Sequence, residues 1–147
     1  MSKLLSLPFV VAAISGVAMA VQGTLNSSLS QKTSLLSATF IVHIIGTLVA
    51  LGAVLAWRVP ILSHNWSSVP WYLYLGGVLS VVIVGLVAVS IPKVGVCNAT
   101  TAIIIGQVSM AVLIDHFGLF GVSRLHWNSW QLLGIIFFAV GAKLLFR

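Results

Sequence analysis

The sequence predicts an all-α fold, a polytopic membrane protein with five transmembrane helices. Of its 147 residues, 60% are hydrophobic and 5% are charged, and the mean hydropathy is +1.19. A soluble domain carries about 25% charged residues, and a soluble core of this size could not hide so much apolar surface. The charged residues stand singly between apolar segments, each able to hold the roughly 20 residues that cross a bilayer. Lipid must therefore be the solvent for most of the chain.

The charged residues mark the ends of the predicted helices, which form one membrane domain over residues 1–147. We expect helices at residues 4–29, 34–57, 71–90, 95–115 and 129–146. Pro60 follows the second helix, and Pro70 precedes the third at a tolerated helix start. Residues 92–95 are expected to form a tight turn before the fourth helix. An aromatic belt is expected at the span ends: Trp57, Trp66, Trp71, Tyr72, Trp127 and Trp130.

The first predicted helix carries a polar stripe. At 3.6 residues per turn, Ser15, Gln22 and Asn26 fall within about 40° of one another. Small residues lie beside them: Ala12, Gly16 and Gly23. The stripe indicates either hydrogen bonds to a neighbouring helix or room for a ligand. The same run also resembles a signal peptide with a cleavage site at residues 18–20, but its apolar character favours a first transmembrane helix.

The second predicted helix places a histidine near mid-membrane. His43 shares one face with other small or polar residues: Thr39, Gly46, Thr47 and Ala50. Because histidine titrates near neutral pH, His43 is a candidate proton carrier. The alternative is a neutral ring that donates one hydrogen bond to a carbonyl. In the third helix, small residues indicate flexibility or close packing and no chemistry: Gly76, Gly77, Ser80 and Gly85.

The fourth predicted helix is polar on two sides. Asn98, Thr101 and Ser109 lie toward one side, and Thr100 and Gln107 lie opposite. Such a helix has little surface suited to lipid, so we expect it to lie centrally and to contact a substrate. Two alternatives stay open. These polar groups form hydrogen bonds only with neighbouring helices, or Asn98 caps the fourth helix, which would then start later than residue 95.

Asp115, the only acidic residue, ends the fourth helix, where the helix dipole disfavours a negative charge. It is a candidate gate or coupling carboxylate. Arg124 and Lys143 are possible cationic partners, Lys143 from an antiparallel second subunit. The alternative is a simple contact at the helix end with His116 or Arg124.

The fifth helix and the charge balance both point to a dimer. Gly134 and Gly141 lie on one face of the fifth helix, where small residues let a second helix come close. Five spans would place three cationic residues on one side of the membrane and four on the other: Lys3, Arg58 and Arg124 against Lys32, Lys93, Lys143 and Arg147. The positive-inside rule needs a larger bias to fix orientation. We therefore expect insertion in both orientations and an antiparallel homodimer, with one dominant topology as the alternative.

Several classes of function lack their residues in this sequence. One Asp, no Glu and one Cys leave no catalytic carboxylate pair, no disulfide framework and no metal-ligand cluster, and no nucleotide-binding motif occurs. The four His residues are not at metal-ligand spacing. The net charge of +6 is scattered between apolar segments, which is unlike a nucleic-acid surface. We expect neither an enzyme nor a cofactor.

Three groups of residues carry a family resemblance: Gln22-Gly23-Thr24-Leu25-Asn26, Ile91-Pro92-Lys93-Val94-Gly95, and Gly106-Gln107 with Ile114-Asp115-His116-Phe117-Gly118. In combination they are similar to the short YdcZ-like family of the drug/metabolite transporter superfamily. The resemblance implies a bacterial inner-membrane protein of five helices that occurs as dual-topology homodimers, opposite-topology pairs or fused inverted halves. Small multidrug exporters of this superfamily use a Glu in the first helix, and this chain has none there.

The predicted function is a small-solute transporter or exporter that alternates access in an antiparallel dimer. Predicted substrate contacts come from helices one, two and four: Gln22, Asn26, His43, Asn98, Thr101 and Gln107. Ser15 and Asp115 are predicted gate or coupling residues. This neutral lining favours a polar uncharged, weakly anionic or amphiphilic substrate. The alternatives are a dual-topology ion channel and a membrane assembly subunit that transports nothing.

Overall fold

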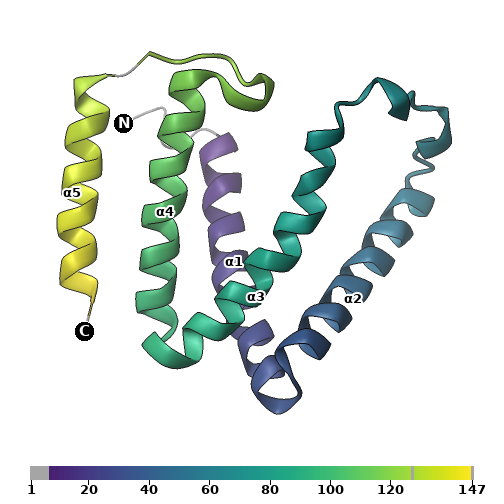
Figure 1. The fold of residues 1–147 in the computed structure, drawn as a ribbon, viewed down its shortest axis with the longest axis horizontal. Coiled ribbons are helices and arrows are strands. Elements are labelled where there is room, and N and C mark those ends of the chain that lie inside the picture. Colours follow the sequence, from purple (N-terminus) through teal and green to yellow (C-terminus); the bar gives the residue numbers. More distant parts are fainter. Residues whose placement is uncertain (1–6, 127, 147) are drawn as a thin grey trace. The chain divides into compact units, whose positions relative to one another are not determined.

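The computed structural model describes residues 7–126 and 128–146, and this part of the chain is helical apart from its connections. It contains the α-helices α1 (Leu7–Lys32), α2 (Leu35–Ala56), α3 (Leu75–Val94), α4 (Val96–Phe117) and α5 (Ser129–Leu145) (Figure 1). Four segments are long and apolar enough to cross a membrane: Leu7–Lys32, Leu35–Ala56, Trp71–Val94 and Val96–Phe117. The predicted all-α fold is therefore confirmed. The apolar part of α5, Leu133–Leu145, is shorter, so a fifth span stays a prediction.

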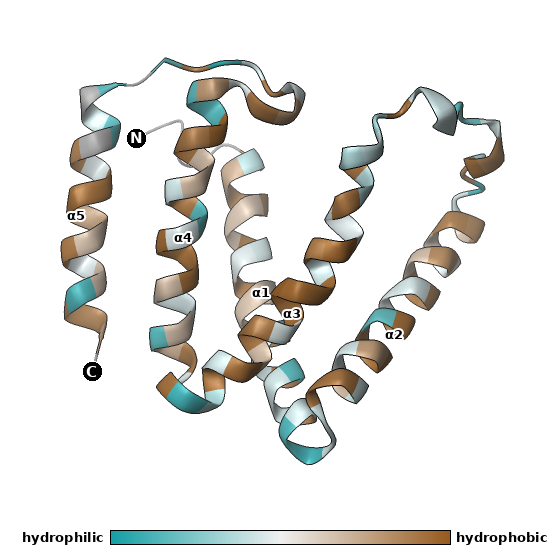
Figure 2. Ribbon diagram, in the orientation of Figure 1, coloured by the Kyte–Doolittle hydropathy of each residue, from teal (hydrophilic) through white to brown (hydrophobic). Residues whose placement is uncertain are grey.

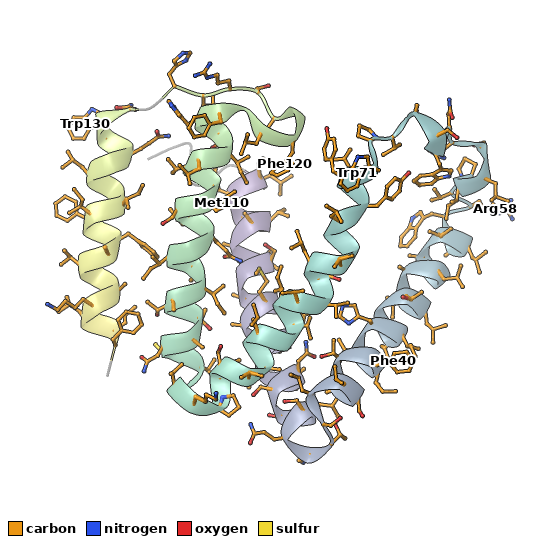
Figure 3. All side chains as sticks on the ribbon, in the orientation of Figure 1. Phe40, Arg58, Trp71, Met110, Phe120 and Trp130 are labelled. Atoms are coloured by element: carbon orange, nitrogen blue, oxygen red, sulfur yellow. The ribbon has the colours of Figure 1, made fainter. Side chains whose placement is uncertain are left out.

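Apolar side chains mostly face outward. Figure 2 shows helices coloured largely hydrophobic, with hydrophilic residues concentrated toward turns and helix ends. Among the described residues, the buried apolar side chains are Ala38, Ala88, Ile91, Ala99 and Ala142. Large side chains such as Phe40, which is 65% exposed, project away from their helix (Figure 3). Such a surface is stable only against lipid or other protein.

The chain divides into two compact units between Pro92 and Lys93. The unit that ends at Pro92 holds α1, α2 and α3, and we call it the three-helix unit. The unit that begins at Lys93 holds α4 and α5, and we call it the two-helix unit. Each unit has its own packing, and each is described by itself below.

In the three-helix unit, α1 packs against α2 next to the short turn that joins them. Ser34 caps α2, because its side chain accepts a hydrogen bond from the Ser37 backbone N–H at 3.1 Å. Helix α3 crosses α1 (Figure 1), and Gly23 lies at this crossing. A Cβ atom at Gly23 would lie 2.9 Å from Val87 Cγ1 and 3.4 Å from Ile91 Cδ1. The small residue is therefore what lets the two helices approach.

The connection between α2 and α3 carries the aromatic belt of this unit. It runs through three short 3₁₀ helices, η2 (Ile61–Ser63), η3 (Trp66–Ser68) and η4 (Trp71–Tyr74). The Trp66 indole N–H donates to the Ile61 carbonyl at 2.9 Å, and the Tyr74 hydroxyl donates to the Trp66 carbonyl at 3.2 Å. Figure 3 shows Trp71 and Arg58 at this same end of the unit. Exposed aromatic rings suit the bilayer interface. Trp127, another predicted belt residue, lies outside the described residues.

The turn predicted over residues 92–95 is wrong in its extent. Helix α3 continues through Pro92 to Val94, and the break comes only at Gly95. Proline removes one backbone N–H from the last turn of a helix but keeps a helical φ. Gly95 has φ 84° and ψ 160°, a conformation that is essentially restricted to glycine. Gly95 therefore ends α3, and it is also the N-cap of α4. Asn98 does not cap this helix, so that alternative is wrong too.

In the two-helix unit, α4 packs against α5. Helix α4 ends at Gly118 in the left-handed conformation, and η5 (Leu119–Gly121) follows. The connection then folds back on the end of α4, where the Leu125 N–H donates to the Asp115 carbonyl at 2.8 Å. Asn128 and Gln131 form a capping box that starts α5. Among the described residues of this unit, the buried ones are Ala99, Thr101 and Ala142.

Candidate functional site

The polar stripe of α1 has two different environments along its length. The Ser15 hydroxyl is exposed and donates to the Ala12 carbonyl of its own helix at 2.7 Å. Gln22 is also exposed. Asn26 is only 7% exposed, because it lies in the half of α1 that packs near the turn to α2. The polar stripe is thus exposed at Gln22 and largely buried at Asn26.

Asn26 makes no side-chain hydrogen bond with the described residues, and its amide atoms keep some accessible surface although the residue as a whole is 7% exposed. Ser27, the next residue in the chain, is 1% exposed, and Thr39 on α2, the helix that packs against α1, is 7% exposed. The Gln31 amide donates to the Ser27 hydroxyl at 3.5 Å, which leaves Asn26 outside that bond. Asn26 is therefore a partly accessible amide in the packed half of α1 that can take a further hydrogen bond.

His43 makes two ring contacts, one within α2 and one to α3. Nδ1 lies 2.7 Å from the Thr39 carbonyl oxygen, and Nε2 lies 3.1 Å from the Ser80 hydroxyl oxygen. The Ser80 hydroxyl also lies 2.7 Å from the Gly77 carbonyl oxygen, to which it can donate. The carbonyl contact matches the simple alternative for His43. The Ser80 contact was missed by the sequence reasoning, which assigned Ser80 to packing alone.

On α4, the three predicted contact residues differ in exposure. Thr101 is 6% exposed, Asn98 is partly buried and Gln107 is exposed. None of the three side chains has a hydrogen bond to another residue in the described ranges. Asn98 lines a cavity of about 490 Å³ between the start of α4 and the end of α5. The other lining residues are Val94, Gly95, Val96, Cys97, Leu144 and Leu145. Asn98 therefore offers an amide to a largely apolar space.

At the other end of α4, the charged residues do not pair as the simple alternative suggested. The Arg124 guanidinium Nε donates to the His116 carbonyl at 2.9 Å. The backbone carbonyl of Asp115 is used by Leu125, while its partly buried carboxylate has no ion pair or hydrogen bond with the residues that the structure describes. Arg124 thus places a cation at the carbonyl end of the helix and is not paired with the Asp115 carboxylate.

The predicted site residues fall into both units. Gln22, Asn26 and His43 belong to the three-helix unit, and Asn98, Thr101 and Gln107 belong to the two-helix unit. Within the first unit, the residues share packing, because Thr39 accepts from His43 and is buried on the helix that packs against α1. A joint site formed by α1, α2 and α4 stays a prediction.

Comparison with known proteins identifies one family. Residues 7–144 match the model of the family described as "Putative inner membrane exporter, YdcZ". A search of curated proteins and a search of solved structures gave no significant match. The match covers nearly the whole described chain, including every residue of the candidate site. Together with the four apolar spans, it places the chain in the inner membrane as a multi-pass protein.

Proposed function

The chain belongs to the YdcZ family of inner membrane exporters, and from this premise we propose that it is a small-solute carrier working by alternating access. In this proposal, two antiparallel copies form one site near the bilayer midplane, and the site opens to each side in turn. Helices α1, α2 and α4 supply its lining. The fold and family give the coarse function, a membrane transporter, and the side chains of the spans support the finer one.

The observation that carries the proposal is Asn26. Asn26 is a largely buried residue whose amide atoms keep some accessible surface, it makes no side-chain hydrogen bond with the described residues, and its helix is apolar enough to span the membrane. Polar groups within membrane spans are costly and often mark solute pathways. A bound solute that accepts from and donates to the amide would complete this group.

The chemistry of the lining defines the class of solute. The proposed contacts are neutral donors and acceptors: Gln22, Asn26, Asn98, Thr101 and Gln107. A carrier for a lone cation would be expected to hold a carboxylate within its spans, and Asp115 stands at the end of α4. We therefore assign a polar uncharged, weakly anionic or amphiphilic solute.

Surface features of the single chain support the dimer. Gln22 and Gln107 are amides exposed on spans, and an exposed amide in lipid is costly. A Cβ atom at Gly134 or Gly141 would have no heavy atom within 4 Å, so this face of α5 has room for a second helix. Nearly balanced cationic residues allow both orientations. A C-terminal reporter fusion should give signal on both sides of the membrane, and signal on one side alone would rule out dual topology.

The function is tested by flux in proteoliposomes. A thermal-shift screen of metabolites and drugs first selects a stabilising compound, and counterflow exchange of that compound is then measured. We expect saturable exchange in the wild type and its loss in Asn26→Ala and Gln107→Ala, with the dimer still assembled by cross-linking. Asn65→Ala is the matched control, because Asn65 is an exposed amide in the α2–α3 connection.

The other outcomes separate the alternatives. Unchanged exchange in both variants would remove these amides from the site. Fast flux without exchange would indicate a channel that uses the same amides as a pore lining. No flux for any compound, with a cellular phenotype that survives both substitutions, would indicate an assembly subunit.

A further inference from the structure

The three contacts around His43 and Ser80 cannot all be hydrogen bonds if the His43 ring is neutral. A carbonyl oxygen only accepts, so His43 Nδ1, at 2.7 Å from the Thr39 carbonyl, must carry a proton. For the same reason, the Ser80 hydroxyl proton is directed at the Gly77 carbonyl, 2.7 Å away. The Ser80 oxygen is then an acceptor toward His43 Nε2 at 3.1 Å. All three bonds exist together only when Nε2 is also protonated.

If the ring is neutral, one of these three hydrogen bonds is lost. With Nδ1 protonated, Nε2 has a lone pair and needs a donor. The one Ser80 hydroxyl proton can serve either Nε2 or the Gly77 carbonyl, and the other contact is then lost. The number of protons on His43 therefore decides how Ser80 is held.

We propose that His43 is the coupling-proton site of this carrier and that Ser80 is the residue through which α3 responds to its protonation. This proposal rests on the carrier function proposed above. With the ring doubly protonated, Ser80 accepts from His43 Nε2 and keeps its bond to the Gly77 carbonyl; with the ring neutral, its hydroxyl donates to only one of the two. A change in proton occupancy thereby changes which contacts hold Ser80 between α2 and α3.

The location suits such a role. His43–Ser80 is the only side-chain hydrogen bond that joins α2 to α3 in the described ranges, across 37 residues of sequence. Helix α2 has no titratable residue besides His43. In the elements packed around it, the titratable groups stand at helix ends or in the connection: Lys32 on α1, Lys93 on α3, and Arg58, His64, Tyr72 and Tyr74 between α2 and α3. No carboxylate in this unit's described part offers a counter-charge to the His43 ring.

The link is tested directly by nitrogen NMR of the complete protein in lipid bilayers, with ¹⁵N-labelled histidine and no solute. The His43 signal is identified by its loss in His43→Asn. We expect a ring with Nδ1 protonated, and in the doubly protonated ring the Nε2 signal should report a hydrogen bond to the Ser80 oxygen. In Ser80→Ala, the Nε2–H loses this acceptor, so its signal should move away from the wild-type chemical shift.

Two matched variants make this result specific. Ser90→Ala removes a hydroxyl that donates to the Leu86 carbonyl within α3 at 2.8 Å, and it should leave the His43 signals unchanged. Ser80→Thr keeps the hydroxyl, so it should restore the wild-type Nε2 signal, and it replaces Ser80→Ala if that variant does not fold. The proposal is overturned if the His43 signals of Ser80→Ala match those of the wild type, or if the neutral ring carries its proton on Nε2.

Flux separates this proposal from the carrier function itself. A pH gradient across the liposome should drive net flux of the solute in the wild type and in Ser90→Ala, and drive it several-fold less in Ser80→Ala. If counterflow exchange occurs but the gradient drives nothing, the proton site is wrong and the carrier stands. If exchange itself is absent, the carrier function fails independently of the proton site.

Discussion

Asn26 of the three-helix unit and Gln107 of the two-helix unit lie in opposite surroundings. Asn26 is 7% exposed, beside Ser27 and close to the α1–α2 turn. Gln107 is exposed on α4. A closely packed position contributes to stability, whereas an exposed one contributes little to it. Substitutions at closely packed positions should therefore lower stability, and substitution of Gln107 should affect transport alone.

The largest effect is expected at Ser27, which is 1% exposed. Ser27→Leu adds volume where none is free, and overpacking of this kind costs about 3 kcal/mol of unfolding free energy. Ser28→Leu is the control, because the adjacent Ser28 is exposed. Unfolding of the purified protein in mixed micelles measures both. Equal stability of the two variants would show that the α1 crossing is not closely packed.

A smaller loss is expected at Gly23. The Cβ atom of Gly23→Ala would lie 2.9 Å from Val87 Cγ1, and the strain should cost about 1–2 kcal/mol relative to Gly16→Ala. Gly16 lies on the same helix with no heavy atom within 4 Å of an added Cβ. Both variants gain the same helix propensity, so their difference in unfolding free energy isolates the contact with α3. A difference of zero would contradict the close approach.

A still smaller loss of unfolding free energy is expected at the end of α4. Arg124→Met removes the hydrogen bond to the His116 carbonyl and a cation from the helix C-terminus, where such a charge contributes about 0.3–1 kcal/mol. Arg58→Met removes a cation from the α2–α3 connection and serves as the comparison. The same loss in both variants would mean that net charge, and not the helix end, is responsible.

The smallest change in stability is expected at Gln107. Gln107→Ala should alter the unfolding free energy by no more than about 0.5 kcal/mol, as expected for an exposed position without packing contacts. It should nevertheless abolish counterflow exchange, which gives the sharpest contrast with Ser27. A clear loss of stability would mean that Gln107 contributes to packing, and it would contradict the contrast between Gln107 and Ser27.

The sequence predicted the helices because charges in the chain occur only where spans end. It also predicted which residues of α1 share a face, since the helical period fixes direction around the axis. Periodicity does not report depth along the axis, so it could not separate the open Gln22 from the buried Asn26. At Pro92, the expectation of a turn was wrong because a proline near the end of a helix removes few hydrogen bonds.

Ser80 was missed for a different reason. Its partner His43 is 37 residues away, and no local pattern reports a contact between two helices. The available signal was weak: Ser80 is the one hydroxyl residue between Leu75 and Val89 of α3, opposite a helix with a lone histidine. Likewise, Arg124 was expected near Asp115, but its choice of the His116 carbonyl depends on how the loop after Gly118 folds back.

Gly95 is the single residue between α3 and α4, so its two backbone angles set the direction in which α4 leaves α3. Helix α4 has 22 residues, so its far end lies about 33 Å from Gly95 at 1.5 Å per residue. A rotation of about 10° at Gly95 would then move that end by roughly 6 Å, about one helical turn. A displacement of this size comes from a small change in two backbone angles. A small change in the backbone angles of Gly95 would therefore produce a large displacement at the far end of α4.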